Sequence, residues 1–199
     1  MDFDIYFTDQ NRRISLDSDE SYLLAYDLSK DILVALAVID PSSYSEEMLE
    51  IENCWINRYE ILGKKSLNHT VLTNEIFTRI LTSNPAYSML MVIISPKKVM
   101  TIGSFGGFRI ERYRNKKWQT VYINQNENKI QTRKSIIGIN DLLFISSKSE
   151  IVNNELLNQI KNLINVNKTS KLICQELKNH YLLPSSEITG MIGIIQIKS

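Results

Sequence analysis

TIGSFGGFRIERYRN, residues 101–115, places three glycines between two strand-like runs. A glycine-rich turn can bind a phosphate where it opens a helix, because the first amides of the helix point at the anion. Here the glycines are followed by FRIERYR, whose pattern is typical of a strand. We therefore interpret Gly103, Gly106 and Gly107 as a bulge or tight bend between consecutive strand segments.

Apolar runs on both sides of this segment predict further strands. Residues 22–26 and 32–39 are apolar without a gap, which is typical of strands that are covered on both faces. Residues 124–135 are polar and predict a loop. The other predicted strands are residues 3–8, 87–95, 99–104, 107–114, 118–123, 141–146 and 187–197.

Amphipathic segments predict helices at residues 44–62, 67–81, 150–165 and 169–180. In the first, Met48, Ile51 and Trp55 are spaced by three and four residues, as one face of a helix requires. The helices come in pairs between runs of strands. This order favours an α+β fold in which two mainly antiparallel sheets are flanked by helix pairs, a four-layer αββα sandwich, and it predicts a single domain over residues 1–199.

Composition and charge argue against several classes of protein. The net charge is +1 and the basic residues are scattered, so neither nucleic acid nor an acidic membrane is an expected partner. The longest apolar runs are far shorter than the ~20 residues of a membrane-spanning helix. The acidic start MDFDIYFTDQ does not resemble a signal peptide, and Cys54 and Cys174 show no metal-binding spacing. We expect a cytoplasmic protein, and the frequent Ile, Asn and Lys suggest an AT-rich bacterial genome.

Several segments carry motifs in a characteristic order. ILVALAVID (32–40) resembles a strand that ends in "vaDG", and TIGSFGGFRI (101–110) resembles "vGDSRaY". DLLFISSKSEI (141–151) resembles "D.lllcSDGl.d", and SSEITGMIGII (185–195) resembles "DNiTvivv". With the acidic stretch before SYLLAY, which resembles "NED", these motifs resemble those of a short bacterial PP2C-type Ser/Thr phosphatase of the PPM superfamily. The resemblance covers nearly the whole chain.

The resemblance implies a metal-dependent chemistry. Active members of this family hold two Mn²⁺ or Mg²⁺ ions that share the water that attacks phosphorus. Hard divalent cations need anionic oxygen ligands, so several carboxylates are required. The resemblance places Asp40 at the aspartate of "vaDG", and it places Asp19 or Glu20 at the acidic position of "NED".

At the other motif positions, serines stand where the family has aspartates. Ser104 takes the place of the aspartate in "GDSR", Ser147 of that in "SDG", and Ser186 of that in "DN". Lys148, next to Ser147, adds positive charge beside the implied metal centre. Glu187 could supply a carboxylate only if the register shifts by one residue. We therefore interpret all these positions as remnants of a site, and we expect no catalytic residue and no bound cofactor or metal ion.

The remaining acids have structural interpretations as well. Any metal ion would be held by Asp40 with Asp19 or Glu20. Asp40, however, follows a strand and could instead cap the next helix. Asp19 and Glu20 could be solvated carboxylates of a loop. Pro41 stands at the glycine of "vaDG", where its fixed φ angle alters the backbone that would offer a carbonyl ligand.

Nucleophilic catalysis by serine finds little support. A nucleophilic serine needs a base within hydrogen-bond reach, and neither His69 nor His180 accompanies a GxSxG motif. Hydrolases with an N-terminal nucleophile have a similar sandwich, but they need Ser, Thr or Cys at the mature N-terminus, and this sequence starts with Met-Asp.

Two functions from different classes remain open. The first is a non-catalytic pseudophosphatase, a regulatory or protein-interaction module that binds a kinase, signalling or secretion component in a bacterial cytosol. The second is a divergent Mn²⁺- or Mg²⁺-dependent protein serine/threonine phosphatase with an altered metal site. A third, more distant alternative is an unrelated α+β binding protein.

Overall fold

The computed structural model describes residues 2–8, 21–29, 32–39, 68–83, 88–95, 97–124, 126, 128–147, 152–166, 168–177 and 192–198. The chain forms two compact units. The first comprises Met1–Arg12, Gly107–Gln125 and Ile136–Ser199, and the second comprises Arg13–Gly106 and Asn126–Ser135. Each unit contains one five-stranded sheet, and we describe each by itself.

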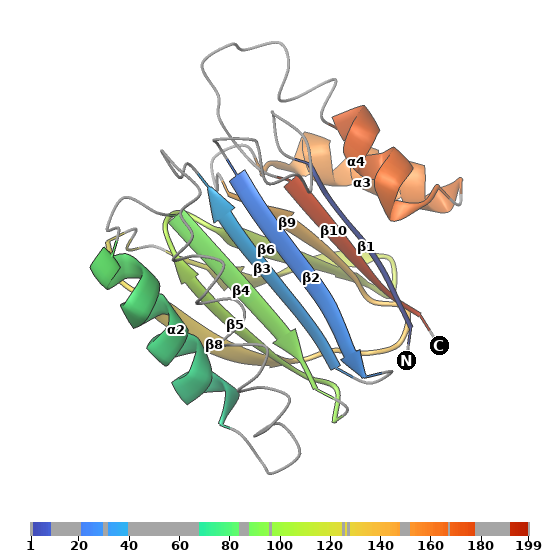
Figure 1. Cartoon of the computed structure of the whole chain (residues 1–199). Coiled ribbons are helices and arrows are strands. Elements are labelled where there is room, and N and C mark those ends of the chain that lie inside the picture. Colours follow the sequence, from blue (N-terminus) through green and yellow to red (C-terminus); the bar gives the residue numbers. More distant parts are fainter. Residues whose placement is uncertain are drawn as a thin grey trace. The chain divides into compact units, whose positions relative to one another are not determined.

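The sheet of the first unit has the strand order β1-β10-β9-β6-β7 (Figure 1). Its strands are β1 (Asp2–Thr8), β6 (Arg109–Arg114), β7 (Lys117–Ile123), β9 (Leu142–Ser146) and β10 (Ile192–Lys198). All of its neighbouring strands are antiparallel. Residue Asp2 pairs with Lys198, so the first and last strands of the chain lie side by side.

Two helices pack on this first sheet. They are α3 (Asn154–Asn165) and α4 (Ser170–Leu177), and α4 contacts β1 and β10. The Asn153 side chain caps α3 by accepting a hydrogen bond from Leu156 N at 2.9 Å. Trp118 Nε1 of β7 donates to the Leu157 carbonyl of α3 at 2.9 Å. The core between helices and sheet is built from Tyr113, Leu142, Phe144, Val152, Leu156, Leu157, Ile160, Ile173, Cys174, Leu177, Ile192 and Ile194.

The sheet of the second unit has the order β2-β3-β4-β5-β8, and α2 (His69–Ser83) packs on β4 and β5. Its strands are β2 (Ser21–Ser29), β3 (Ile32–Ile39), β4 (Ser88–Ile94), β5 (Val99–Phe105) and β8 (Gln131–Ile136). Every residue of β4 after Ser88 is buried. A run buried on both faces needs no polar alternation, which explains the continuous apolar sequence MLMVII.

Most of the elements expected from the sequence are confirmed, with one error. Residues 124–135, expected to be a loop, contain all of β8 except its last residue, Ile136, and β8 pairs at the edge of the second sheet. All of its residues are exposed or half-buried, and charged side chains are common on edge strands, so the polar sequence QTRKSI suits this position. The expected helix at residues 44–62 lies outside the described residues.

The glycine-rich segment is only partly a bend. Gly106 has a φ angle of +99°, and the chain bends at Gly106 and Gly107, as expected. Gly103 instead sits in regular register opposite Met91, so its interpretation as part of a bulge or bend is wrong. A Cβ atom at residue 103 would lie well inside van der Waals distance of Thr73 Cγ2 in α2. This glycine therefore permits close packing of a helix on a strand.

The expected α+β class with two mainly antiparallel sheets is confirmed. The organisation as a single domain remains a prediction. None of the helices that the structure describes is long and apolar enough to cross a membrane.

Candidate functional site

Three of the positions assigned to a remnant site lie in the sequence at or next to the end of a strand: Asp40, Ser104 and Ser147. Strand β3 ends at Ile39, directly before Asp40, and β9 ends at Ser146, directly before Ser147. Ser104 is the penultimate residue of β5. Only Ser104 and Ser147 can be placed in the structure. The other assigned positions lie outside the described residues: Asp19, Glu20, Asp40, Ser186 and Glu187.

Ser104 lies in the interior of the second unit. It pairs with Leu90 of β4, and its side chain is fully buried. The neighbouring Gly103 brings α2 close to this strand. The buried environment at this position thus contains a neutral hydroxyl in place of the carboxylate that the resemblance would put there.

Ser147 lies in the first unit, at the end of a central strand. The preceding Ser146 is buried and pairs with Arg109 on one side and Ile192 on the other. Ser147 itself is partly buried. Because Ser104 belongs to the other unit, each serine is placed only within its own sheet.

Two buried acids in the first unit form ion pairs with arginines. Glu111 of β6 accepts from Arg109 Nε and from Thr120 Oγ1, each at 2.7 Å. Asp141, directly before β9, is paired with Arg114. Within the described ranges, no three His, Cys, Asp or Glu side chains form a group that could hold a metal ion.

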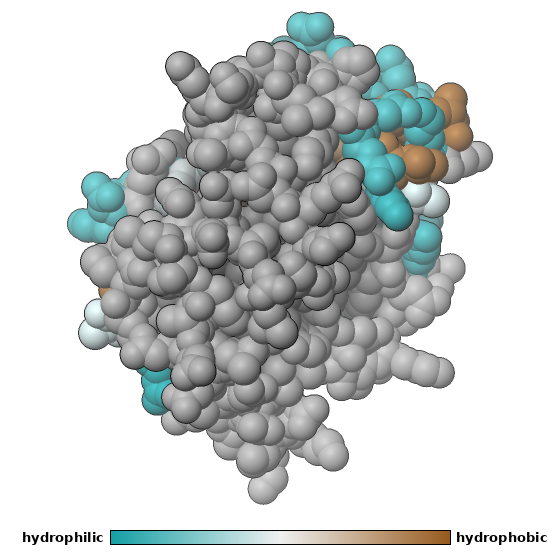
Figure 2. Space-filling model, turned by 45° about the horizontal axis from the view of Figure 1, so that its top comes forward, coloured by the Kyte–Doolittle hydropathy of each residue, from teal (hydrophilic) through white to brown (hydrophobic). Residues whose placement is uncertain are grey.

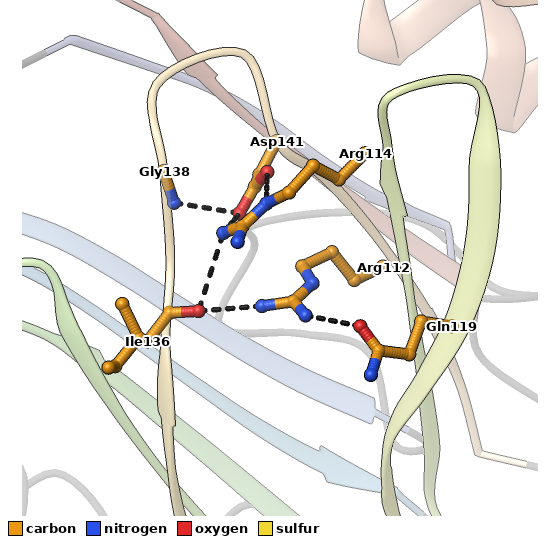
Figure 3. A network of polar contacts seen from close by, with 6 residues as sticks. All are labelled: Arg112, Arg114, Gln119, Ile136, Gly138 and Asp141. Atoms are coloured by element: carbon orange, nitrogen blue, oxygen red, sulfur yellow. Dashed lines mark hydrogen bonds and ion pairs between the residues drawn. The ribbon is translucent and has the colours of Figure 1, made fainter.

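The Asp141 pair is the centre of a polar network that sequence reasoning missed (Figure 3). Arg114 Nε donates to Asp141 Oδ1 at 2.6 Å, and Arg114 Nη2 donates to Oδ2 at 2.5 Å. Gly138 N donates to the same Oδ2 at 2.7 Å. The hydrogen bond with Asp141 raises the pKa of Arg114 above its ordinary value. Two parallel bonds of this kind fix geometry as well as adding energy.

Arg112 extends the network with uncharged partners. Its Nη1 donates to the Ile136 carbonyl at 2.6 Å, and its Nη2 donates to Gln119 Oε1. Burial, followed by the charge of Arg114, lowers the pKa of Arg112. Side chains alternate along a strand, so Arg112 and Arg114 share one face of β6, while Tyr113 lies in the core on the other. Two sequence features could have indicated this network: the alternation Arg-Tyr-Arg at residues 112–114, and the acid Asp141 directly before the apolar run LLFI.

His69 begins α2, near the helix start where the sequence placed it. Burial, and then the charge of Lys134, lower the pKa of His69. The unfolded chain therefore binds a proton more readily than the folded protein, and stability should fall as pH drops below about 6.5.

We expect the His69→Gln variant to lose less stability than the natural protein when the pH is lowered from about 7.5 to about 5.5. Urea unfolding of both proteins at both pH values measures the two losses. Equal losses in the two proteins would contradict this prediction.

The sequence matches no protein-family model and no curated protein significantly. Solved structures, in contrast, match over nearly the whole chain. The PP2C phosphatase domain of SpoIIE from Bacillus subtilis, solved with a fragment of its regulatory domain, is 15% identical with a TM-score of 0.65. The match covers 99% of this chain and 64% of that chain, so this protein spans about two thirds of the SpoIIE fragment.

Two further structures match at similar levels. RsbX in complex with magnesium is 11% identical with a TM-score of 0.62, over 98% of this chain and 96% of RsbX. A protein of the bacterial stressosome, a modular system adapted to control secondary messenger signalling, is 12% identical with a TM-score of 0.62, over 98% and 100% of the two chains. The fold expected from the sequence motifs is confirmed: the chain has a PP2C-like phosphatase fold.

Proposed function

We propose that this protein is a pseudophosphatase, a non-catalytic PP2C-like protein that acts as a regulatory or protein-interaction module. One observation carries the proposal. The two assigned site positions that the structure describes, Ser104 and Ser147, hold hydroxyl groups on an otherwise intact scaffold of strands.

The physical argument concerns charge compensation. Two divalent cations repel each other strongly at short distance unless carboxylates lie between and around them. A serine hydroxyl brings no negative charge, and the buried position of Ser104 offers little solvent to compensate. Each replacement therefore weakens a two-metal centre, and the sequence adds Lys148 beside Ser147.

The structural relatives suggest the setting. Solved structures with this fold include SpoIIE, described as a cell-fate determinant, and a protein of the stressosome. We propose by analogy that this protein binds a kinase, signalling or secretion component in a bacterial cytosol. Fold analogy identifies the class of partner only and leaves the individual partner open.

A divergent metal-dependent phosphatase is the alternative function. RsbX, which has the same fold, was solved with magnesium. The motif resemblance assigns Asp40, which directly follows β3 in the sequence, to the family's aspartate. In this alternative, Asp40 with Asp19 or Glu20 would hold Mn²⁺ or Mg²⁺, and Glu187 could add a carboxylate. These carboxylates would supply the negative charge that the serines lack.

Calorimetric titration with Mn²⁺, combined with phosphatase assays on a phosphopeptide and an aryl phosphate, separates the two functions. We expect a flat titration and no metal-dependent turnover. Micromolar binding with turnover that Asp40→Asn abolishes would overturn the proposal. Glu155→Gln, which changes an exposed acid on α3, is the matched control and should leave any activity unchanged.

A further inference from the structure

The loop of residues 136–141, which starts at the last residue of β8 and leads into β9, presents apolar side chains to solvent. Ile136 is 70% exposed and Ile139 is 45% exposed, while Ile137 between them is buried. Single exposed isoleucines are common on protein surfaces. Two on one short loop, with the intervening isoleucine turned inward as an anchor, form a small apolar projection.

The backbone of this loop is held at several points (Figure 3). The Ile136 carbonyl accepts hydrogen bonds from Arg112 at 2.6 Å and from Arg114 at 3.4 Å. Gly138 N donates to the Asp141 carboxylate, and Asn140 N donates to the Ile197 carbonyl at 2.8 Å. In Figure 3 the Ile136 carbonyl points toward the arginines and its side chain points away from them. The network fixes the main chain and leaves the apolar side chain exposed, so a partner that binds there would have little loop entropy to remove.

The surroundings of the loop are positively charged. Residues 112–119 on strands β6 and β7 include Arg112, Arg114, Lys116 and Lys117 and contain no acidic residue. Lys116 and Lys117 are exposed at the turn between these strands. The one acid of the loop, Asp141, is buried and already paired with Arg114, which leaves an excess of positive charge. The whole chain has a net charge of only +1, so this is a local concentration.

We propose that loop 136–141 and the β6–β7 turn form a docking surface for a protein segment that combines acidic with apolar side chains. The apolar residues of such a segment contact Ile136 and Ile139, and its carboxylates face the arginines and lysines. This inference rests on the proposed function, because it specifies where the interaction module binds its partner. All of the residues involved lie in the first unit.

Within the first unit, the docking surface is remote from Ser147, the remnant position that the structure describes there. Asp141 directly precedes β9 and Ser147 directly follows it, so the two lie at opposite ends of the strand. At ~3.3 Å per residue they are about 20 Å apart. Docking therefore does not involve Ser147, and its measurement needs no metal.

A second apolar area serves as a control. Val166 and Leu172, near the junction of α3 and α4, are 64% and 47% exposed. Figure 2 shows apolar surface beside hydrophilic surface over these helices. Lys168 there is paired with Glu176, which leaves Lys171 as the exposed lysine beside Leu172, whereas the docking surface has the adjacent exposed pair Lys116 and Lys117.

The test uses a short fluorescein-labelled peptide in which glutamate alternates with leucine, titrated with the full chain and followed by anisotropy. We expect saturable binding that weakens at least about tenfold in the double variant Ile136→Ser, Ile139→Ser. Lys116→Gln with Lys117→Gln should weaken binding about threefold and reduce its salt dependence. Val166→Ser with Leu172→Ser should leave binding unchanged. Each variant changes exposed residues only, so all should fold.

Several outcomes would overturn the docking surface. The first is that the peptide shows no saturable binding. The second is that the Val166→Ser, Leu172→Ser control loses as much affinity as the Ile136→Ser, Ile139→Ser variant. The third is that a peptide with lysine in place of glutamate binds as tightly as the acidic peptide. The proposal would also be overturned if phosphatidylserine vesicles bound the protein and if the same substitutions weakened that binding as much as they weaken peptide binding. The surface would then recognise a membrane. Metal-dependent turnover would refute the proposed function without changing these titrations, so the two failures are distinguishable.

Discussion

Replacing Asp141 with alanine is expected to lower the free energy of unfolding by about 3 kcal/mol. The change removes a buried carboxylate that accepts two hydrogen bonds from Arg114 and one from Gly138 N. Breaking a buried ion pair by removing one partner is costly, because the other charge keeps its desolvation penalty. Arg114 is 36% exposed and regains part of its hydration, which places the expected loss at the lower end for such pairs. Urea unfolding, followed by the fluorescence of the tryptophans, measures it.

The exposed ion pair between Glu75 and Arg79 provides the control. Their side chains are 38% and 55% exposed, and they lie one turn apart on α2 with an N–O distance of 3.4 Å. Glu75→Ala should therefore cost no more than about 0.5 kcal/mol. If Asp141→Ala costs equally little, the network does not hold the loop, and the preorganisation of Ile136 and Ile139 loses its basis.

A second variant removes the ion pair between Arg114 and Asp141 but keeps the hydrogen bond from Gly138 N to Asp141. Arg114→Met keeps an apolar stem but removes the guanidinium, and leaves Asp141 with Gly138 N alone. The double variant Asp141→Ala, Arg114→Met should be more stable than the sum of the two single losses predicts, since neither charge is left unpaired. Strict additivity of the two losses would contradict a direct interaction.

The elements that the sequence predicted correctly are those whose burial follows a regular pattern along the chain. Residues 32–39 and 89–94 are apolar without a break, and both form central strands of the second sheet. Amphipathic spacing similarly located α3, where Leu156 and Ile160 face the core. These features are local, because the position of a side chain on a face follows from its spacing along the chain.

The features that were missed depend on partners distant in sequence. Strand β8 is polar at the edge of its sheet, and nothing in QTRKSI distinguishes such a strand from a loop. The pairing of Arg114 with Asp141 joins residues that become neighbours only when β6 pairs with β9. Gly103 was assigned to a bend because glycine often marks one, whereas the reason for it is α2 on the neighbouring face.

The candidate site could be located from the sequence only through motif resemblance. That resemblance identified the fold, which the solved structures bear out at identities of 11–15%. At such identities the scaffold is retained while site chemistry varies, so fold does not fix activity. Of the assigned positions, the structure describes Ser104 and Ser147, and the role of Asp40 stays a prediction for the metal titration to test.

Gly103→Ala is expected to lower the free energy of unfolding by about 2 kcal/mol. The new methyl group would overlap Thr73 Cγ2, which is buried in α2. Thr73 cannot rotate away freely, because its Oγ1 donates to the His69 carbonyl at 2.8 Å. The backbone at Gly103 does not itself need glycine, since it is a regular strand position in register with Met91. Overlap with the helix is thus the cause of the loss, and urea unfolding followed by circular dichroism measures it.

Thr73→Ser supplies the matched rescue. Serine keeps the hydroxyl that bonds to His69 but lacks the Cγ2 methyl, and the next nearest atoms to a Cβ at residue 103 are at 3.5 and 3.6 Å, in ordinary contact. Alone, Thr73→Ser should cost about 1 kcal/mol for the lost buried methyl group. In the Thr73→Ser protein, Gly103→Ala should cost almost nothing. The overlap is gone, and an alanine loses less backbone conformational entropy on folding than a glycine does. A loss of about 2 kcal/mol in both backgrounds would mean that an atom other than Thr73 Cγ2 limits the space, and that close packing of α2 on β5 is not why residue 103 is glycine.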